Sequence, residues 1–259
     1  MAMNTPASVP VGVQLYSLRE QAAVDFPAVL ERLGAKGFVG VEFAGFQGLS
    51  PEEVAGALER GGLEVASAHV GLAEADEFAA ALDQHAAIGC DTVVIPAAFD
   101  PGFGDLDAVK GTADLVNAAN EIARTRGITL GYHNHFWELA PLDDGRPALL
   151  HFFEHVAPDV IAEVDIYWAQ IGGSDPAAIV TELGERCRLL HVKDGPGDDR
   201  ASANIPVGDG AIDTPGVLAA ATSAQWHLIE FDKCDTDMFD AVERSYDYLV
   251  GNDLSRGRS

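Results

Sequence analysis

The sequence predicts a single-domain α/β protein, a (β/α)8 barrel, and three observations lead to this fold. Short apolar segments of strand length alternate eight times with segments whose apolar residues recur at helical spacing. The strand-like segments are apolar on both faces and rich in Val and Ile, as parallel strands buried on both sides should be. The chain has 259 residues, which suits a barrel of roughly 250 residues, and its composition shows no inter-domain linker.

The first half of the chain supplies four strand-then-helix units. The predicted strands are residues 11–18, 38–45, 63–71 and 90–99, and the predicted helices are about 25–37, 50–62, 74–88 and 105–126. Gly37 closes the first helix, as glycine commonly does at a C-cap. The second helix opens with Ser50, then Pro51 at its first position and Glu53 at its third, which is a capping-box pattern.

The second half repeats the same alternation. The fifth strand is the segment GYHNHFWEL (131–139), which follows the apolar residues 128–130 and runs out into a loop. The later strands are 160–165, 187–194 and 226–232, and the helices are about 147–157, 175–185, 213–223 and 236–250. We therefore expect a barrel over residues 11–250 between polar tails at 1–10 and 251–259, with residues 252–259 frayed.

A doubly wound open sheet is the alternative fold for this alternation. That fold carries a glycine-rich phosphate loop after its first strand when it binds nucleotides. The corresponding stretch here, QLYSLRE (14–20), contains no glycine, so the barrel is preferred.

The charge and the cysteines exclude several classes of function. The formal net charge of −25 would repel nucleic-acid phosphates and anionic membranes, so neither partner is expected. No apolar run approaches the roughly 18–20 residues of a membrane span, and no secretory signal precedes the first strand. Cys90, Cys187 and Cys234 are too few and too scattered for a disulfide framework or a cysteine-based zinc site. We expect buried free thiols at the first two positions and a cytoplasmic protein.

Metal-ligand and acid–base residues lie at the ends of four consecutive predicted strands. They are His133, Asn134, His135 and Glu138; Asp165; His191, Lys193 and Asp194; and Glu230 and Asp232. The carboxyl ends of barrel strands meet at one mouth, which predicts a single site. Carboxylates with an imidazole suit Mn²⁺, Mg²⁺ or Co²⁺. The predicted metal ligands are Glu138, Asp165, His191 and Glu230, with His133 or His135 as the alternatives to Glu138.

The remaining candidates have a structural reading beside the functional one. Glu230 lies among apolar neighbours and would cost several kcal/mol if buried without a compensating cation. Lys193 is expected to stabilise a developing oxyanion, or to form a salt bridge with Asp194 or Asp232. Residues at the ends of the first three strands, and two aromatic side chains further along the chain, could bind substrate or could only pack within the protein. These are Gln14, Tyr16, Glu42, His69, His135 and Trp168.

Several motifs together resemble the xylose isomerase-like TIM barrel superfamily, in its sugar phosphate isomerase/epimerase branch with inosose dehydratase-like relatives. The motifs are GVQLYSLR, YHNHFWE, EVDIYWAQIGGSDP, HVKDG, PVGDGAID, WHLIEFD and SYDYL, and they cover about residues 11–250. The resemblance implies one divalent metal held by Glu, Asp, His and Glu from strands five to eight. Asp165, His191 and Glu230 match the last three positions. The first position is Gly131 here, so Glu138 is the nearest carboxylate.

The resemblance implies a metal-dependent isomerase or epimerase of a sugar or keto-polyol, working through a metal-stabilised enediolate. Mn²⁺ is the first choice of metal, with Co²⁺, Mg²⁺ or Zn²⁺ as alternatives, and His133, Glu138 or Glu230 is the expected general base. A lyase that eliminates a β-hydroxyl is the runner-up, and a non-catalytic sugar-binding barrel is the alternative of another class. A nuclease is disfavoured by the acidic charge. Few basic residues flank the mouth, so we expect an unphosphorylated substrate, and relatives often form homo-oligomers. The substrate and the choice between isomerase and lyase stay open.

Overall fold

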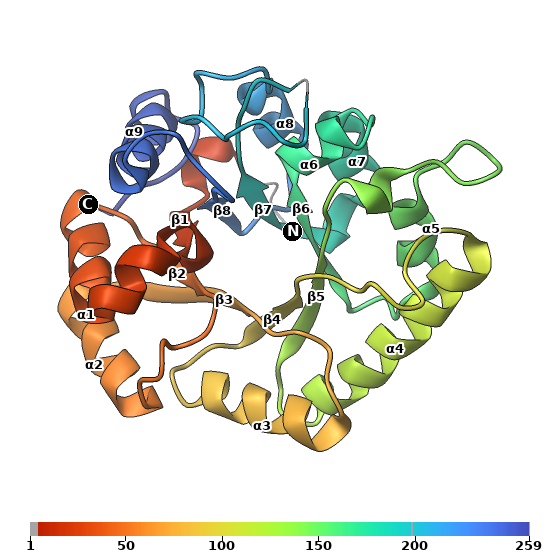
Figure 1. The fold of residues 1–259 in the computed structure, drawn as a ribbon, viewed down its shortest axis with the longest axis horizontal. Helices are drawn as coiled ribbons and strands as arrows, with labels where there is room; N and C mark the ends of the chain where they lie inside the picture. The colour runs from red at the N-terminus through yellow and green to blue at the C-terminus, as the bar shows by residue number, and fades with distance from the viewer. Residues whose placement is uncertain (1–4, 198, 259) are drawn as a thin grey trace.

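The strands of the computed structural model, which describes residues 5–197 and 199–258, form one closed parallel barrel (Figure 1). They pair in chain order, and β1 pairs with β8 to close the barrel. The strands are β1 Val11–Gln14, β2 Gly40–Phe43, β3 Glu64–His69, β4 Thr92–Ile95, β5 Thr129–His133, β6 Ile161–Asp165, β7 Cys187–Val192 and β8 Trp226–Ile229. The predicted (β/α)8 barrel is confirmed.

Helices surround the barrel on the outside (Figure 1). They are α1 Arg19–Lys36, α2 Pro51–Gly61, α3 Ala75–Ala86, α4 Leu106–Arg124, α5 Ala148–His155, α6 Ile166–Ile171, α7 Pro176–Leu183, α8 Thr214–Ala220 and α9 Met238–Gly251. Short 3₁₀ turns lie at η1 Pro6–Ser8, η2 Leu15–Leu18, η3 Trp137–Leu139 and η4 Gly184–Arg186. Within the described residues, no helix is long and apolar enough to cross a membrane.

The helix boundaries follow the local capping signals. Gly37 ends α1 in the left-handed region (φ 112°), and Ser50 and Glu53 form the predicted capping box of α2. Helix α1 begins at Arg19 rather than near residue 25. The backbone of Asp25 is extended there (φ −152°, ψ 87°), and its side chain accepts a hydrogen bond from the N–H of Ala28. The predicted helix start at residue 25 therefore corresponds to a capping interaction at a kink within α1, and the helix itself begins earlier.

The barrel interior has an apolar floor below a polar mouth. Val94, Ile161 and Leu189 form a separate apolar cluster, with Trp226 packed against it. A side chain at Gly40 would meet the Trp226 ring at 2.8 Å, so the glycine makes room for the indole. Side chains alternate along each strand, and the next inward residues above Ile161 and Leu189 are the buried polar residues Glu163 and His191. The fold thereby places the polar residues of several strands in one layer at the carboxyl end of the barrel.

The C-terminal segment is ordered by the barrel and is not frayed, contrary to the prediction. The N–H of Arg256 donates to the carbonyl of Val9 (2.8 Å), and the Arg258 guanidinium donates to the carbonyls of Gly61 and Gly62 (2.7 and 2.6 Å). Ser255 is buried. These contacts satisfy backbone groups at the amino-terminal side of the barrel; the predicted tail residues 1–4 and 259 lie outside the described residues.

Candidate metal centre and active site

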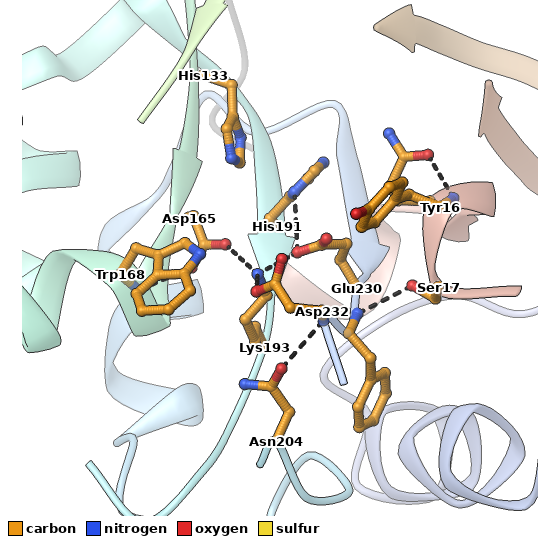
Figure 2. Close-up of polar contacts among 12 residues, drawn as sticks. Tyr16, Ser17, His133, Asp165, Trp168, His191, Lys193, Asn204, Glu230 and Asp232 are labelled. Carbon is orange, nitrogen blue, oxygen red and sulfur yellow. Dashed lines mark hydrogen bonds and ion pairs between the residues drawn. The ribbon is translucent and has the colours of Figure 1, made fainter. Parts of the chain in front are cut away.

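Three of the four predicted metal ligands come together at the carboxyl ends of β6, β7 and β8 (Figure 2). Asp165, His191 and Glu230 are buried, and each offers one ligand atom within 4.8 Å of the others. We call these three residues the carboxylate cluster. Asp165 is also the N-cap of α6, because its Oδ1 accepts a hydrogen bond from the N–H of Trp168 (2.8 Å). That helix was not predicted, and it orients the Asp165 carboxylate.

A second cluster lies beside the first and shares His191 with it. Three imidazole nitrogens surround Oε2 of Glu163: Nε2 of His69 at 2.6 Å, Nδ1 of His133 at 3.1 Å and Nε2 of His191 at 3.2 Å. We call His69, His133, Glu163 and His191 the imidazole cluster. Glu163 was not a predicted site residue. Its alternation with Asp165 in the strand VIAEVD is the signal that places both side chains on the inner face.

Glu42 of β2 faces the imidazole cluster from the opposite side. It is fully buried, and its Oε1 lies 2.7 Å from Nε2 of His191 and 3.3 Å from Nε2 of His69. Gln14 donates to the same carboxylate at 2.6 Å, and Ser67 donates to it at 2.5 Å. Glu42 and Gln14, both predicted to bind substrate, are therefore buried within a hydrogen-bond network.

Lys193 occupies the centre of the carboxylate cluster. Its Nζ lies 2.9 Å from Oδ2 of Asp165 and 2.7 Å from Oδ2 of Asp232, and it is in direct contact with Oε2 of Glu230 (Figure 2). Asp194, the other partner considered for this lysine, instead accepts hydrogen bonds from backbone N–H groups of the following loop. The ammonium of Lys193 thus forms ion pairs with two of the predicted metal ligands, Asp165 and Glu230.

Glu138 lies apart from both clusters. Its Oε1 accepts from the Tyr132 hydroxyl (3.1 Å), and its Oε2 accepts from the N–H of His135 (2.9 Å). Burial raises the pKa of Glu138 to about 7. Strand β5 ends at His133, and the chain then turns into η3, which carries Glu138 away from the cluster residues. The side chain that β5 contributes to the clusters is His133.

Aromatic residues line one side of the mouth. The ring of His135 stacks on Trp137 with centroids 4.4 Å apart and an interplanar angle of 7°. Trp168 lies with its ring 5.1 Å from Nζ of Lys193, as Figure 2 shows for the two side chains. Burial lowers the pKa of His135 to about 3, so this imidazole is neutral near pH 7. Tyr16 is 44% exposed and stands at the rim.

Burial and charge act in opposite directions on the clustered groups. Burial raises the pKa of Asp165 to about 6 despite the nearby ammonium of Lys193. For Glu230, burial also disfavours the charged form, but Lys193 and His191 outweigh it and hold the pKa well below its usual range. Burial likewise opposes the charge on Lys193, yet Asp165 and Glu230 raise its pKa well above the usual value. Glu230 and Lys193 are therefore both charged near neutral pH.

The residues present fit a divalent cation. In the described part of the chain, Oε1 of the buried Glu163 has no hydrogen-bond partner, although burying an unpaired carboxylate oxygen is costly. Imidazole nitrogens and carboxylate oxygens are donors that suit Mn²⁺, Co²⁺ and Zn²⁺. His191 offers a nitrogen to both clusters, so it is a ligand in either arrangement.

The sequence model of the family described as xylose isomerase-like TIM barrel matches residues 27–231. The chain belongs to this family. A solved structure of a sugar phosphate isomerase/epimerase from Parabacteroides distasonis is 26% identical, with 98% of each chain covered and a TM-score of 0.79. A comparison with curated proteins finds no match.

Two further structures share the fold at lower identity. One is a probable 3-DHS dehydratase from Bacillus anthracis, with 12% identity, coverage of 93% of this chain and 98% of that one, and a TM-score of 0.74. The other, an IolI protein with a bound zinc atom, has 12% identity, coverage of 94% and 99%, and a TM-score of 0.71. The resemblance read from the motifs is confirmed at the level of the family.

Proposed function

We propose that the chain is a divalent-metal-dependent isomerase or epimerase acting on an unphosphorylated sugar or keto-polyol. The observation that carries the proposal is the buried group of Asp165, His191, Lys193 and Glu230 at the carboxyl end of the barrel, with Glu230 and Lys193 in contact. Family membership and the full-length similarity to a sugar phosphate isomerase/epimerase support it. An L-ribulose 3-epimerase and a D-tagatose 3-epimerase-like protein share the fold.

The reaction begins with removal of the proton next to a carbonyl group. When bound, the divalent cation supplies Lewis acidity, which makes that C–H more acidic. Glu230 is the proposed general base, because its buried carboxylate lies at the carboxyl end of the barrel in contact with Lys193, the group proposed to stabilise the developing oxyanion. The electron pair of the C–H bond moves to the carbonyl oxygen and gives an enediolate. Lys193 stabilises the negative charge on that oxygen.

The second half of the reaction returns the proton. In an isomerisation, Glu230 donates the proton to the former carbonyl carbon, while the adjacent hydroxyl gives its proton to the former carbonyl oxygen and becomes the new carbonyl group. In an epimerisation, Glu230 keeps the proton that it removed, and a second acid donates a proton to the opposite face of the same carbon. Water-excluding side chains around the mouth, Trp168 among them, keep the proton with the enzyme. Loss of a β-hydroxyl from the same enediolate would give the lyase outcome, and product analysis separates the two.

The charges at the mouth favour a neutral substrate. Lys193 is already matched by Asp165, Glu230 and Asp232, so a phosphate placed beside it would meet an excess of negative charge. Trp168 presents an apolar ring next to this group, of the kind that packs against a sugar face.

The test is α-hydrogen exchange in D₂O, followed by NMR with a panel of keto-sugars and inososes. The metal-loaded wild type should incorporate deuterium, and Glu230→Gln should be slower by about 10²–10⁴-fold, the usual contribution of a general base. Glu138→Gln is the matched control, since it changes another buried carboxylate outside both clusters. If the wild type binds sugars but exchanges no hydrogen with any of them, the chain is a sugar-binding barrel and the proposal fails.

A further inference from the structure

We infer that aromatic side chains at the mouth bind a neutral aryl group attached to the sugar, so that the substrate is an aryl-substituted keto-sugar and not a free monosaccharide. The inference rests on the proposed function, which places the reacting sugar beside Lys193 and Glu230. It deepens that function by naming the part of the substrate that lies outside the reaction centre. We call four rings the aromatic strip: Phe99, Trp137, His135 and Trp168.

The aromatic strip runs from the proposed reaction centre to the outside of the protein through successive ring contacts. The Trp168 ring lies 5.1 Å from Nζ of Lys193, and its centroid is 6.4 Å from that of His135. His135 stacks on Trp137 at 4.4 Å, and the centroids of Trp137 and Phe99 are 5.5 Å apart. Phe99 is the outer end and is 77% exposed. The rings follow the carboxyl ends of β4, β5 and β6, so the strip lies on the mouth side of the barrel.

The outer end of the aromatic strip lies beyond the reach of a free monosaccharide at the reaction centre. Three ring-to-ring contacts separate Trp168, which lies next to Lys193, from Phe99. A single sugar ring packed on Trp168 would therefore leave Phe99 in water. Covering an exposed phenyl ring removes apolar surface from water, which favours binding. A group that gains this contribution must extend outward from the sugar along the strip.

The outer half of the strip presents carbon atoms to an incoming group. Phe99 has a phenyl ring, and Nε1 of Trp137 is buried, so the accessible part of that indole is hydrocarbon. The hydroxyl groups of a second sugar ring would find no hydrogen-bond partner on these two rings. An aryl group would bury apolar surface there and would also gain the offset or edge-on contacts that aromatic pairs prefer. The chemistry of the two rings therefore favours an aryl group over a second sugar.

The charges around Phe99 favour a small neutral group over a second copy of the chain. Phe99 is followed in the same loop by Asp100 and Asp105, both exposed, and the chain has a formal net charge of −25. Most homodimers are two-fold symmetric and bring the same face of each subunit together. Two such faces would place like charges against each other. The same carboxylates disfavour an anionic aryl group, so we infer a neutral one.

The experiment is calorimetric titration of the protein, with Mn²⁺ present, by paired methyl and phenyl β-glycosides of glucose, galactose, mannose and xylose. These probes have no carbonyl group and cannot react by the proposed route, so the titration reports binding alone. At least one phenyl glycoside should bind about 10-fold more tightly than its methyl counterpart, and Phe99→Ala should reduce that ratio by at least about 3-fold. Val24→Ala is the matched control, because Val24 is 88% exposed on α1, and it should keep the ratio.

Several results would overturn the inference. They are no binding of any glycoside, no phenyl preference in any pair, and a preference that Phe99→Ala retains. Cellobiose binding as tightly as phenyl glucoside would overturn it by indicating a second sugar ring. A wild-type dimer that Phe99→Ala converts to a monomer in light scattering would overturn it by showing that a second copy covers Phe99.

Hydrogen exchange in D₂O tests the proposed function separately, with keto-sugars that carry a phenyl group and keto-sugars that do not. Exchange in a protein without any phenyl preference would overturn the inference and leave the proposed function intact. A preference that depends on Phe99, in a protein that exchanges no hydrogen with either kind of sugar, would support the aryl site and reject the proposed function.

Discussion

Lys193 is the residue whose replacement tests the electrostatic account of the mouth most directly. Its ammonium is buried and contacts Asp165 and Glu230, which are buried, and Asp232, whose side chain is 36% exposed. In Lys193→Met the two buried carboxylates lose their counter-ion. Removing one partner of a buried ion pair costs about 3–5 kcal/mol, and the exposed Asp232 adds little to this. We expect a loss in the free energy of unfolding of about 4 kcal/mol at pH 7.5.

The loss should depend on pH, with a sign that follows from the pKa shifts. In the wild type, Lys193 depresses the pKa of Glu230, so the stability from this pair is present above the carboxyl's ordinary value of 4.5 and is lost only as the pH falls through the lower folded value. In the variant, burial raises the pKa of Asp165 further above its wild-type value of about 6, because the ammonium that opposed this shift is gone, and the folded state binds a proton more tightly than the unfolded chain. The variant therefore gains stability as the pH falls from 7.5 to 5, and the difference in the free energy of unfolding between wild type and variant becomes smaller.

The assay is urea denaturation of both proteins with a chelator present, at pH 7.5 and pH 5. Lys110→Met is the control, because Lys110 is 46% exposed and 3.9 Å from its partner Asp107. That substitution should change the free energy of unfolding by less than about 0.5 kcal/mol at either pH. A loss in Lys193→Met below about 1 kcal/mol, within the range of a surface ion pair, would refute the reasoning. A difference in the free energy of unfolding that is as large at pH 5 as at pH 7.5 would refute it equally.

Three further predictions concern residues outside the two clusters. Burial raises the folded pKa of Glu138 from 4.5 to about 7, so the stability cost of its charge grows as the pH rises between these values. In urea melts, Glu138→Gln should be more stable than the wild type by about 3 kcal/mol at pH 8 and nearly equal to it near pH 4.5. Asp194 accepts hydrogen bonds from four backbone N–H groups of the loop after β7. The free energy of unfolding of Asp194→Ala should therefore fall by at least about 3 kcal/mol, and the loop should become open to limited proteolysis, whereas Asp194→Asn should lose less. Burial raises the pKa of the Cys90 and Cys187 thiols to about 12, so a thiol reagent should label Cys234 alone in the native protein and all three cysteines in urea; rapid native labelling of either buried thiol would contradict the packing.

Much of the fold could be read from the sequence, because the signals that specify it are local. Helix ends at Gly37 and Ser50 depend on residues within one turn, and the structure places both ends as predicted. The alternation of apolar strands and amphipathic helices is also local, and it sufficed for the barrel and for the mouth at the carboxyl ends of β5 to β8. The inward direction of Asp165, His191 and Glu230 follows from the same alternation within each strand.

The partners of each side chain were decided by the tertiary structure. Alternation says which residues point inward, but the tilt and stagger of the strands determine which of them meet across the barrel, and these depend on pairing between distant segments. In the sequence, Glu163 and Glu42 therefore look like isolated acids in apolar strands. In the folded chain both lie next to the imidazole of His191. The length of β5 likewise determines the position of Glu138. The strand ends at His133, and the turn that follows places the Glu138 carboxylate beside the Tyr132 hydroxyl and away from the clusters.

The sequence by itself determined that this chain would be a (β/α)8 barrel with acid and imidazole side chains at one mouth. The division of those side chains into an ion pair around Lys193 and a cage around Glu163 exists only in the folded chain. The physical reason is that charge balance is set by distances of a few ångströms between residues up to 149 positions apart, such as Glu42 and His191. No local pattern in the sequence encodes those distances.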